Sequence, residues 1–336
     1  MRLRGFLQMM MAVLLLSMFV VPSVMAGGSA EEEAGSADGG ESAPSPTQLV
    51  FGTGGTSGLY YPIGGALKTV FEESQMVRAV NVESTGASVM NINNIDSGIN
   101  QVAIVMSDVA YDARNGRGQF EGNPVDVQAI AGLYPNVVQV VATASSGITS
   151  IEDMQGKRVG VGQVGSGVEQ SAQKVLESAG LTYDDLGQVT NTGYADSVQS
   201  MKNGTLDAAF FTSGIPNANI VDVMQTMDVV FVPVDGSVAE TLIENYPFYE
   251  NFEIPAGVSA QYDLDDAVQT VAIRNLLIVS PDLPEELVSE LTGRFYEYLG
   301  SEQVTIDALR QFDRDAMDRN LVLELHPGAQ QFYGSR

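Results

Sequence analysis

Short apolar runs alternate with segments of helical periodicity onward from Gln48. The runs are rich in β-branched residues and are bounded by glycines and polar residues, which is typical of buried strands. They cover Leu49–Phe51, Arg78–Val82, Val102–Val105, Val127–Ala131, Val137–Ala142, Arg158–Val161, Ala208–Phe211 and Val229–Val232. Repeated alternation of strand and helix predicts an α/β architecture with largely parallel sheets.

Three helices have recognisable ends. Ser166 is a candidate N-cap and Gly180 a candidate stop for the first helix. A second helix is expected at 195–203, followed by Gly204, and a third at 284–299, where Pro284 suits the first turn. The first helix carries an apolar face made of Val168, Ala172, Val175, Leu176 and Ala179. Such faces predict packing against a core.

Two long apolar segments, Val268–Val279 and Val137–Ser145, predict strands that cross between two lobes. We expect the first lobe to combine residues 48–140 and 275–330, with a second lobe, residues 141–274, inserted between them. Two connecting strands would also form a hinge.

The N-terminus has the pattern of a secretory signal peptide. Arg2 and Arg4 precede an apolar block over Met9–Val21, and the small-residue site at Val24–Ala26 predicts cleavage after Ala26. Residues 27–47 read GGSAEEEAGSADGGESAPSPT, an acidic linker too poor in apolar residues to fold by itself. We therefore expect residues 1–26 to be removed and the protein to be periplasmic.

Composition excludes several classes of function. None of the 336 residues is cysteine, which excludes disulfides and thiolate metal sites. The net charge of −26 opposes binding to nucleic acid and to anionic membranes. The 42 acidic residues are scattered singly, so we expect a halophile-like acidic surface and no metal site. Nothing in the sequence demands assembly, and we expect a monomer without a cofactor.

The turn at Gly52–Gly64, GTGGTSGLYYPIG, follows a strand and leads into a helix that opens near Pro62. Glycines allow the main chain to approach a ligand closely, and the N–H groups that begin a helix favour an anion. This turn predicts an anion site. The alternative is a glycine-rich turn that only connects a strand to a helix.

The segment Gly160–Gly165 matches G-x-G-x-x-G between a strand and a helix. Dinucleotide binding would also need an acidic residue at the end of the next strand, but Gln188–Thr190 is followed by asparagine and threonine. The free N–H groups at 166–168 would instead hold a carboxylate.

Three further polar loops end strands at 83–91, 106–108 and 211–217. With the two glycine-rich turns, they make five loops at strand ends, divided between the two lobes. Such loops meet at one cleft when the strands are parallel.

The ordered segments GTGGTSGLYYPIGG, ESTGASVMNI, QVAIVMSDVAY, LYPNVVQVV, DMQGKRVGVGQVGSG and LDAAFFTSGIPN resemble the TAXI family of TRAP-transporter solute-binding proteins. The resemblance extends from about Gln48 to Leu299. It implies a two-lobed type II periplasmic binding-protein fold, with two parallel or mixed sheets joined by crossover strands. It also implies a receptor that closes on glutamate or a C4–C5 dicarboxylate, such as 2-oxoglutarate, and delivers it to a TRAP membrane permease.

The resemblance also implies a set of ligand contacts, taken position by position from these motifs. They are Gly55, Thr56, Tyr60, Ser84, Thr85, Ser88, Asp108, Val164, Ser166, Gly167, Thr212, Ser213 and Pro216.

Several roles stay open at this point. Arg274 is a candidate to reach the cleft, although most arginines are solvated. Tyr60 is expected to face the cleft, with Tyr61 packed under the loop or also contacting the ligand. Asp108 is expected either to contact a ligand ammonium group or to cap the following helix.

Catalysis is disfavoured. His326 is the sole histidine, stands before Pro327, and is expected at the surface far from the loops. Ser166 has no second histidine to serve as its base, and the G-x-S-x-G spacing is absent. The alternatives to a transport receptor are a periplasmic ligand-sensing adaptor for a membrane signalling partner and a hydrolase built on Gly165–Gly167.

Overall fold

A computed structural model describes residues 46–336, apart from 258–261 and 263. The predicted signal peptide, residues 1–26, and almost all of the predicted linker lie outside the described residues. The described residues belong to one compact unit. Among them, none of the helices combines the length and the apolar character that crossing a bilayer requires.

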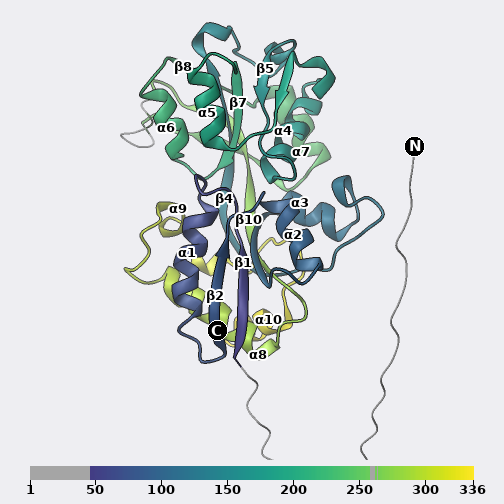
Figure 1. The fold of residues 1–336 in the computed structure, drawn as a ribbon, viewed down its shortest axis with the longest axis vertical. Coiled ribbons are helices and arrows are strands. Elements are labelled where there is room, and N and C mark those ends of the chain that lie inside the picture. The colour runs from purple at the N-terminus through teal and green to yellow at the C-terminus, as the bar shows by residue number, and fades with distance from the viewer. Residues whose placement is uncertain (1–45, 258–261, 263) are drawn as a thin grey trace, which may run out of the picture. The chain divides into compact units, whose positions relative to one another are not determined.

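Strands and helices alternate along most of the described chain, as the apolar pattern predicts (Figure 1). The strands are β1 (Thr47–Gly52), β2 (Val77–Glu83), β3 (Val102–Met106), β4 (Gln128–Thr143), β5 (Arg158–Gly160), β6 (Gln188–Thr190), β7 (Ala208–Ser213), β8 (Val229–Val232), β9 (Tyr249–Ile254) and β10 (Val268–Val279). The α-helices are α1 (Tyr60–Phe71), α2 (Ser88–Asp96), α3 (Ser107–Arg114), α4 (Gly167–Ser178), α5 (Tyr194–Lys202), α6 (Ala218–Met224), α7 (Gly236–Asn245), α8 (Glu285–Leu299), α9 (Asp307–Arg310) and α10 (Pro327–Gly334).

The described strands join into one mixed sheet in the order β2-β1-β3-β10-β4-β7-β5-β6, with β8 beside β4 and β9 beside β10. Strands β1, β2 and β3 are parallel, as are β5, β6 and β7. The predicted α/β class is confirmed. The two expected sheets are continuous because β4 and β10 belong to both.

The two expected crossover segments are the long strands β4 and β10, which pair side by side (Figure 1). One half of β10, Asn275–Val279, pairs with β3, and the other half, Val268–Ile273, pairs with β9. Residues Val137–Ala142 of β4 pair with β7. The sequence predicted two strands within 127–142, but Pro135 between them does not end the strand, which bends through register shifts instead.

Alternating side chains put the core on both faces of the sheet. In β3, Ala103 and Val105 pack with α2, α3 and α4, while Val102 and Ile104 pack with α1 and α8. In β4, Val137 and Val141 pack with α5 and α6. This division follows from the two-residue period of a strand. The loops at the strand ends are thereby anchored between two packed layers.

The predicted helix ends are mostly correct. Ser166 is the N-cap of α4, and its Oγ accepts from the Glu169 N–H at 3.1 Å. Pro284 is the N-cap of α8 and lies just outside its first turn. The surface placement expected for His326 is wrong, since it is buried, and its Nδ1 accepts from the Gly328 N–H at 3.1 Å as the N-cap of α10.

Candidate functional site

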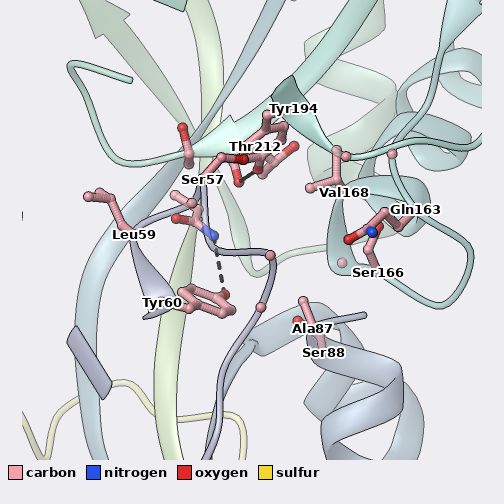
Figure 2. A pocket seen from close by; sticks show the side chains of 18 of the residues that line it. Ser57, Leu59, Tyr60, Ala87, Ser88, Gln163, Ser166, Val168, Tyr194 and Thr212 are labelled. Carbon is pink, nitrogen blue, oxygen red and sulfur yellow. Dashed lines mark hydrogen bonds between the residues drawn. The ribbon is translucent and has the colours of Figure 1, made fainter. Parts of the chain in front are cut away.

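A cavity of about 410 Å³ lies among the ends of six strands and the loops that follow them (Figure 2). Its volume falls in the range of small-molecule sites. The lining comes from the β1–α1, β2–α2, β5–α4 and β6–α5 loops, from the ends of β3 and β7, and from Tyr134 and Asn136 of β4. Tyr60, Ser166 and Tyr194 lie around the same space although they are far apart in the chain (Figure 2).

Four helices begin at the wall of this cavity. Tyr60, Ser88, Gly167 and Tyr194 are the first residues of α1, α2, α4 and α5, and all four line it. The first N–H groups of a helix have no partner within the helix and carry its positive dipole end. No lysine or arginine occurs among the described residues that line the cavity, where Asp196 is the one carboxylate. Backbone dipoles are therefore the main source of positive potential.

Glycines permit the close approaches at this site. Gly162 and Gly165, in the β5–α4 loop, have φ values of +93° and +73°, which side chains other than glycine rarely adopt. A Cβ on Gly167 would lie 2.4 Å from Met106 Sδ and 2.9 Å from Ser88 Oγ. The start of α4 thus packs directly onto the ends of β3 and α2.

The hydroxyl groups at the cavity also hold the loops in place. Ser84 Oγ donates to the Gly54 carbonyl at 3.0 Å, and Ser88 Oγ accepts from the Met106 N–H at 3.0 Å. Tyr194 donates to the Thr212 carbonyl at 2.8 Å. Each of these bonds joins two neighbouring segments of the wall and holds them in position relative to each other.

The structure brings nine of the thirteen predicted contact residues to the cavity wall. These are Gly55, Thr56, Tyr60, Ser84, Ser88, Ser166, Gly167, Thr212 and Ser213. Thr85, Asp108, Val164 and Pro216 do not line it. Thr85 Oγ1 instead donates to the Thr53 carbonyl at 2.9 Å within its own loop, and Val164 is 69% exposed.

Asp108 differs most from its expected role. It is fully buried, and its Oδ2 lies 3.0 Å from Lys174 Nζ and accepts from the Tyr249 hydroxyl at 3.1 Å. Lys174 also pairs with Asp112 at 3.0 Å. The N-cap of α3 is Met106, so Asp108 neither caps that helix nor reaches the cavity. A buried carboxylate needs such a partner, and this one is 66 positions away in sequence.

Two other open roles are decided by contacts. Arg274 donates to the carbonyls of Leu133 and Ala316, at 3.3 Å and 2.6 Å, and does not line the cavity. Tyr61 is exposed rather than packed under the loop, whereas Tyr60 is buried at the cavity wall.

Sequence reasoning missed part of the wall. Tyr134, Asn136, Gln163 and Tyr194 line the cavity without having been predicted as contacts. A signal was present for the first two, because a tyrosine and an asparagine flank Pro135 inside a mostly apolar strand. The wall at Tyr194 comes from a sixth loop, 191–193, that the sequence did not single out.

Comparison with known proteins identifies a family and a shared fold. A sequence model of the NMT1-like family matches residues 51–334. The alkanesulfonate-binding protein SsuA from Xanthomonas axonopodis pv. citri, bound to MOPS, is 13% identical, with 88% of this chain and 86% of that chain covered and a TM-score of 0.51. PhnD1 from Prochlorococcus marinus, in complex with methylphosphonate, is 10% identical, with coverage of 79% and 88% and a TM-score of 0.50. At these identities the likeness establishes a fold of the type II periplasmic binding-protein kind and no ligand.

Proposed function

This chain belongs to the NMT1-like family. From that premise we propose that it is an exported solute receptor. It would bind a small organic anion and deliver it to a TRAP membrane permease. The coarser part, a solute-binding protein, agrees with the fold shared with binding proteins. The TRAP partner rests on the TAXI-like motifs of the sequence. The proposed ligand is glutamate or a C4–C5 dicarboxylate such as 2-oxoglutarate.

The observation that carries this proposal is the convergence of four helix N-termini on a cavity whose described lining has no lysine or arginine. Each charge-assisted hydrogen bond from such an N–H group contributes about 1.5–3 kcal/mol. Two carboxylate groups that each receive two such bonds would be held without a cationic side chain.

The proposed mechanism is closure about the paired strands β4 and β10. Residues 48–140 and 275–330 would form one lobe and residues 141–274 the other. Hydrogen bonds join these proposed lobes in this structure, among them Val89 N–H to the Gly165 carbonyl at 3.1 Å, Asn219 Nδ2 to the Ser57 carbonyl at 2.9 Å, and Lys174 Nζ to Asp108 Oδ2 at 3.0 Å. A ligand that contacts both sides would favour the closed state, and the permease would recognise that state.

Binding without turnover is expected at this site. Ser166 serves as a helix N-cap, and His326 caps α10 and is not among the lining residues. A general base for a serine nucleophile must lie within hydrogen-bond reach. A stoichiometric complex is therefore the expected outcome with any ligand.

A thermal-shift screen tests the proposal. The chain from Gly27 onward is unfolded at high salt with amino acids, mono- and dicarboxylates, and neutral and cationic compounds. A ligand at 100 times its dissociation constant adds about 2.7 kcal/mol to the free energy of unfolding. A selective shift with an organic acid supports the receptor. A shift with neutral or cationic compounds alone refutes the anion site.

The partner is tested by the genes that flank this one. Adjacent genes for multi-span permease subunits support delivery to a transporter. An adjacent sensor kinase gene supports the alternative of a ligand-sensing adaptor, which would use the same cavity.

A further inference from the structure

Asn275 lies where β10 changes its partners. It is the first residue of β10 to pair with β3, opposite Met106, and the pairing with β4 shifts register between Arg274 and Leu276. Such irregularities redirect side chains out of the regular ladder. Here Asn275 Nδ2 donates to the Tyr134 carbonyl at 2.9 Å. The orientation of the Asn275 amide is thereby determined, because only its nitrogen can donate to a carbonyl.

The orientation of the Asn275 amide determines the direction of the hydrogen bonds that Tyr60 makes. The Asn275 oxygen faces Tyr60, whose hydroxyl donates to it. The Tyr60 oxygen then accepts from Asn136 Nδ2 at 3.3 Å. Burial raises the pKa of Tyr60 well above its ordinary value, so the phenol retains the proton that this arrangement requires. Asn136 is consequently held with its nitrogen toward Tyr60 and its oxygen away from it.

The Asn136 oxygen and the Tyr134 hydroxyl are both buried and have no hydrogen-bond partner among the described residues. Both side chains belong to the cavity wall, and each is 2% exposed. Buried polar atoms in native proteins are nearly always paired, and an unpaired one destabilises the fold. A ligand group that reaches these atoms from the cavity would satisfy both.

We propose that this site selects a carboxylate ligand that also carries a hydrogen-bond donor, either a hydroxyl or an ammonium group. Tyr60 and Asn275 are the positioning residues that turn the Asn136 oxygen toward this donor. This inference rests on the proposed receptor function. The carboxylates would occupy the helix N-termini, and the donor would meet Asn136.

The site should therefore bind acids of equal chain length with different affinities, according to the group that each acid carries. An unsubstituted acid or a 2-oxo acid offers only acceptors beyond its carboxylates. Its oxo group can accept from the Tyr134 hydroxyl, but an acceptor placed against the Asn136 oxygen leaves that oxygen unpaired. Sites built to pair with a substrate hydroxyl or amine discriminate strongly against analogues that lack it. We expect at least a tenfold difference in dissociation constant within a matched set.

The test is calorimetric titration of the chain from Gly27 onward with three matched sets. They are propionate, pyruvate, lactate and alanine; succinate, oxaloacetate, malate and aspartate; and glutarate, 2-oxoglutarate, 2-hydroxyglutarate and glutamate. In the set that binds most tightly, the hydroxy or the amino acid should bind at least tenfold more tightly than the unsubstituted and oxo acids. The preferred member of the set distinguishes a hydroxyl from an ammonium donor.

The outcomes separate this inference from the receptor function. If an oxo or unsubstituted acid binds as tightly as its hydroxy and amino counterparts, the donor requirement is wrong and the receptor function stands. If no acid in the three sets gives heat, both are overturned.

Two variants test the residues involved. Tyr134→Phe removes a hydroxyl that has no partner among the described residues, so the ligand-free protein should remain at least as stable while the preferred acid binds at least fivefold more weakly. Tyr60→Phe frees the Asn136 amide to turn and should reduce the affinity ratio of hydroxy or amino acid to oxo acid at least threefold. Tyr61→Phe is the matched control, since Tyr61 is exposed and outside the wall, and its ratio should not change. An unchanged affinity in Tyr134→Phe, or an unchanged ratio in Tyr60→Phe, would overturn the proposed roles.

Discussion

Replacing Gly167 by alanine tests whether closure brings α4 onto β3 and α2. The added Cβ would lie 2.4 Å from Met106 Sδ and 2.9 Å from Ser88 Oγ, whereas unstrained contacts are about 3.5–4.0 Å. Overpacking of this kind costs about 1–3 kcal/mol. If the contact exists only in the closed state, the cost appears in ligand binding and not in the stability of the open state. The dissociation constant should then rise roughly five- to 150-fold.

Two measurements decide this prediction. Titration calorimetry gives the dissociation constant, and urea unfolding without ligand gives the free energy of unfolding. Gly65→Ala is the matched control, because a Cβ there meets nothing within 4 Å and alanine favours the helix by about 1 kcal/mol. A Gly167→Ala protein that loses stability without ligand, yet keeps its affinity, would show that α4 contacts β3 permanently and would refute the closure argument.

Three further predictions follow from buried and surface charge. In the ligand-bound, closed protein, Lys174→Met leaves Asp108 buried without its cation and should lower the free energy of unfolding in urea by about 3–5 kcal/mol, whereas Lys202→Met, at an exposed pair, should cost less than about 1 kcal/mol. Burial lowers the pKa of His326, so its contribution to stability is present above the ordinary histidine pKa and is lost as pH falls below it. Unfolding of His326→Asn should therefore depend less on pH between 7 and 5, about the range where histidine titrates, and an unchanged pH dependence would contradict this. With a net charge of −26, the melting temperature of the unaltered protein should rise as sodium chloride is added, and a fall would count against self-repulsion.

The elements of the fold were largely predictable because their signals are local. Periods of two and 3.6 residues, a serine N-cap at Ser166 and glycines between apolar runs each act within a few positions. The positions of the loops at strand ends follow from the same pattern. Strand β9 was not predicted, because Glu250 and Glu253 give it a polar composition, and its strand character comes from pairing with β10.

The cavity wall was predictable as a set of loops and only in part as individual side chains. Gly55, Ser88 and Ser166 lie in loops that their own sequences mark, and they reach the wall. Asp108 was expected in such a loop too, but it lies in the first turn of α3, where it pairs with Lys174 away from the cavity. No local sequence pattern predicts the pairing of Asp108 with Lys174, since the two residues meet only when α3 and α4 pack together.

The orientation of the polar groups was decided by tertiary structure. Asn136 and Asn275 are 139 positions apart, counted from their numbers in the sequence, and only the pairing of β4 with β10 brings both to Tyr60. The sequence by itself determined an α/β chain and predicted anion-favouring loops at its strand ends, because helix starts and glycine turns are properties of neighbouring residues. Which side chains face the cavity, and which atom each one presents, depends on contacts between residues far apart in the chain, and only the folded structure establishes those contacts.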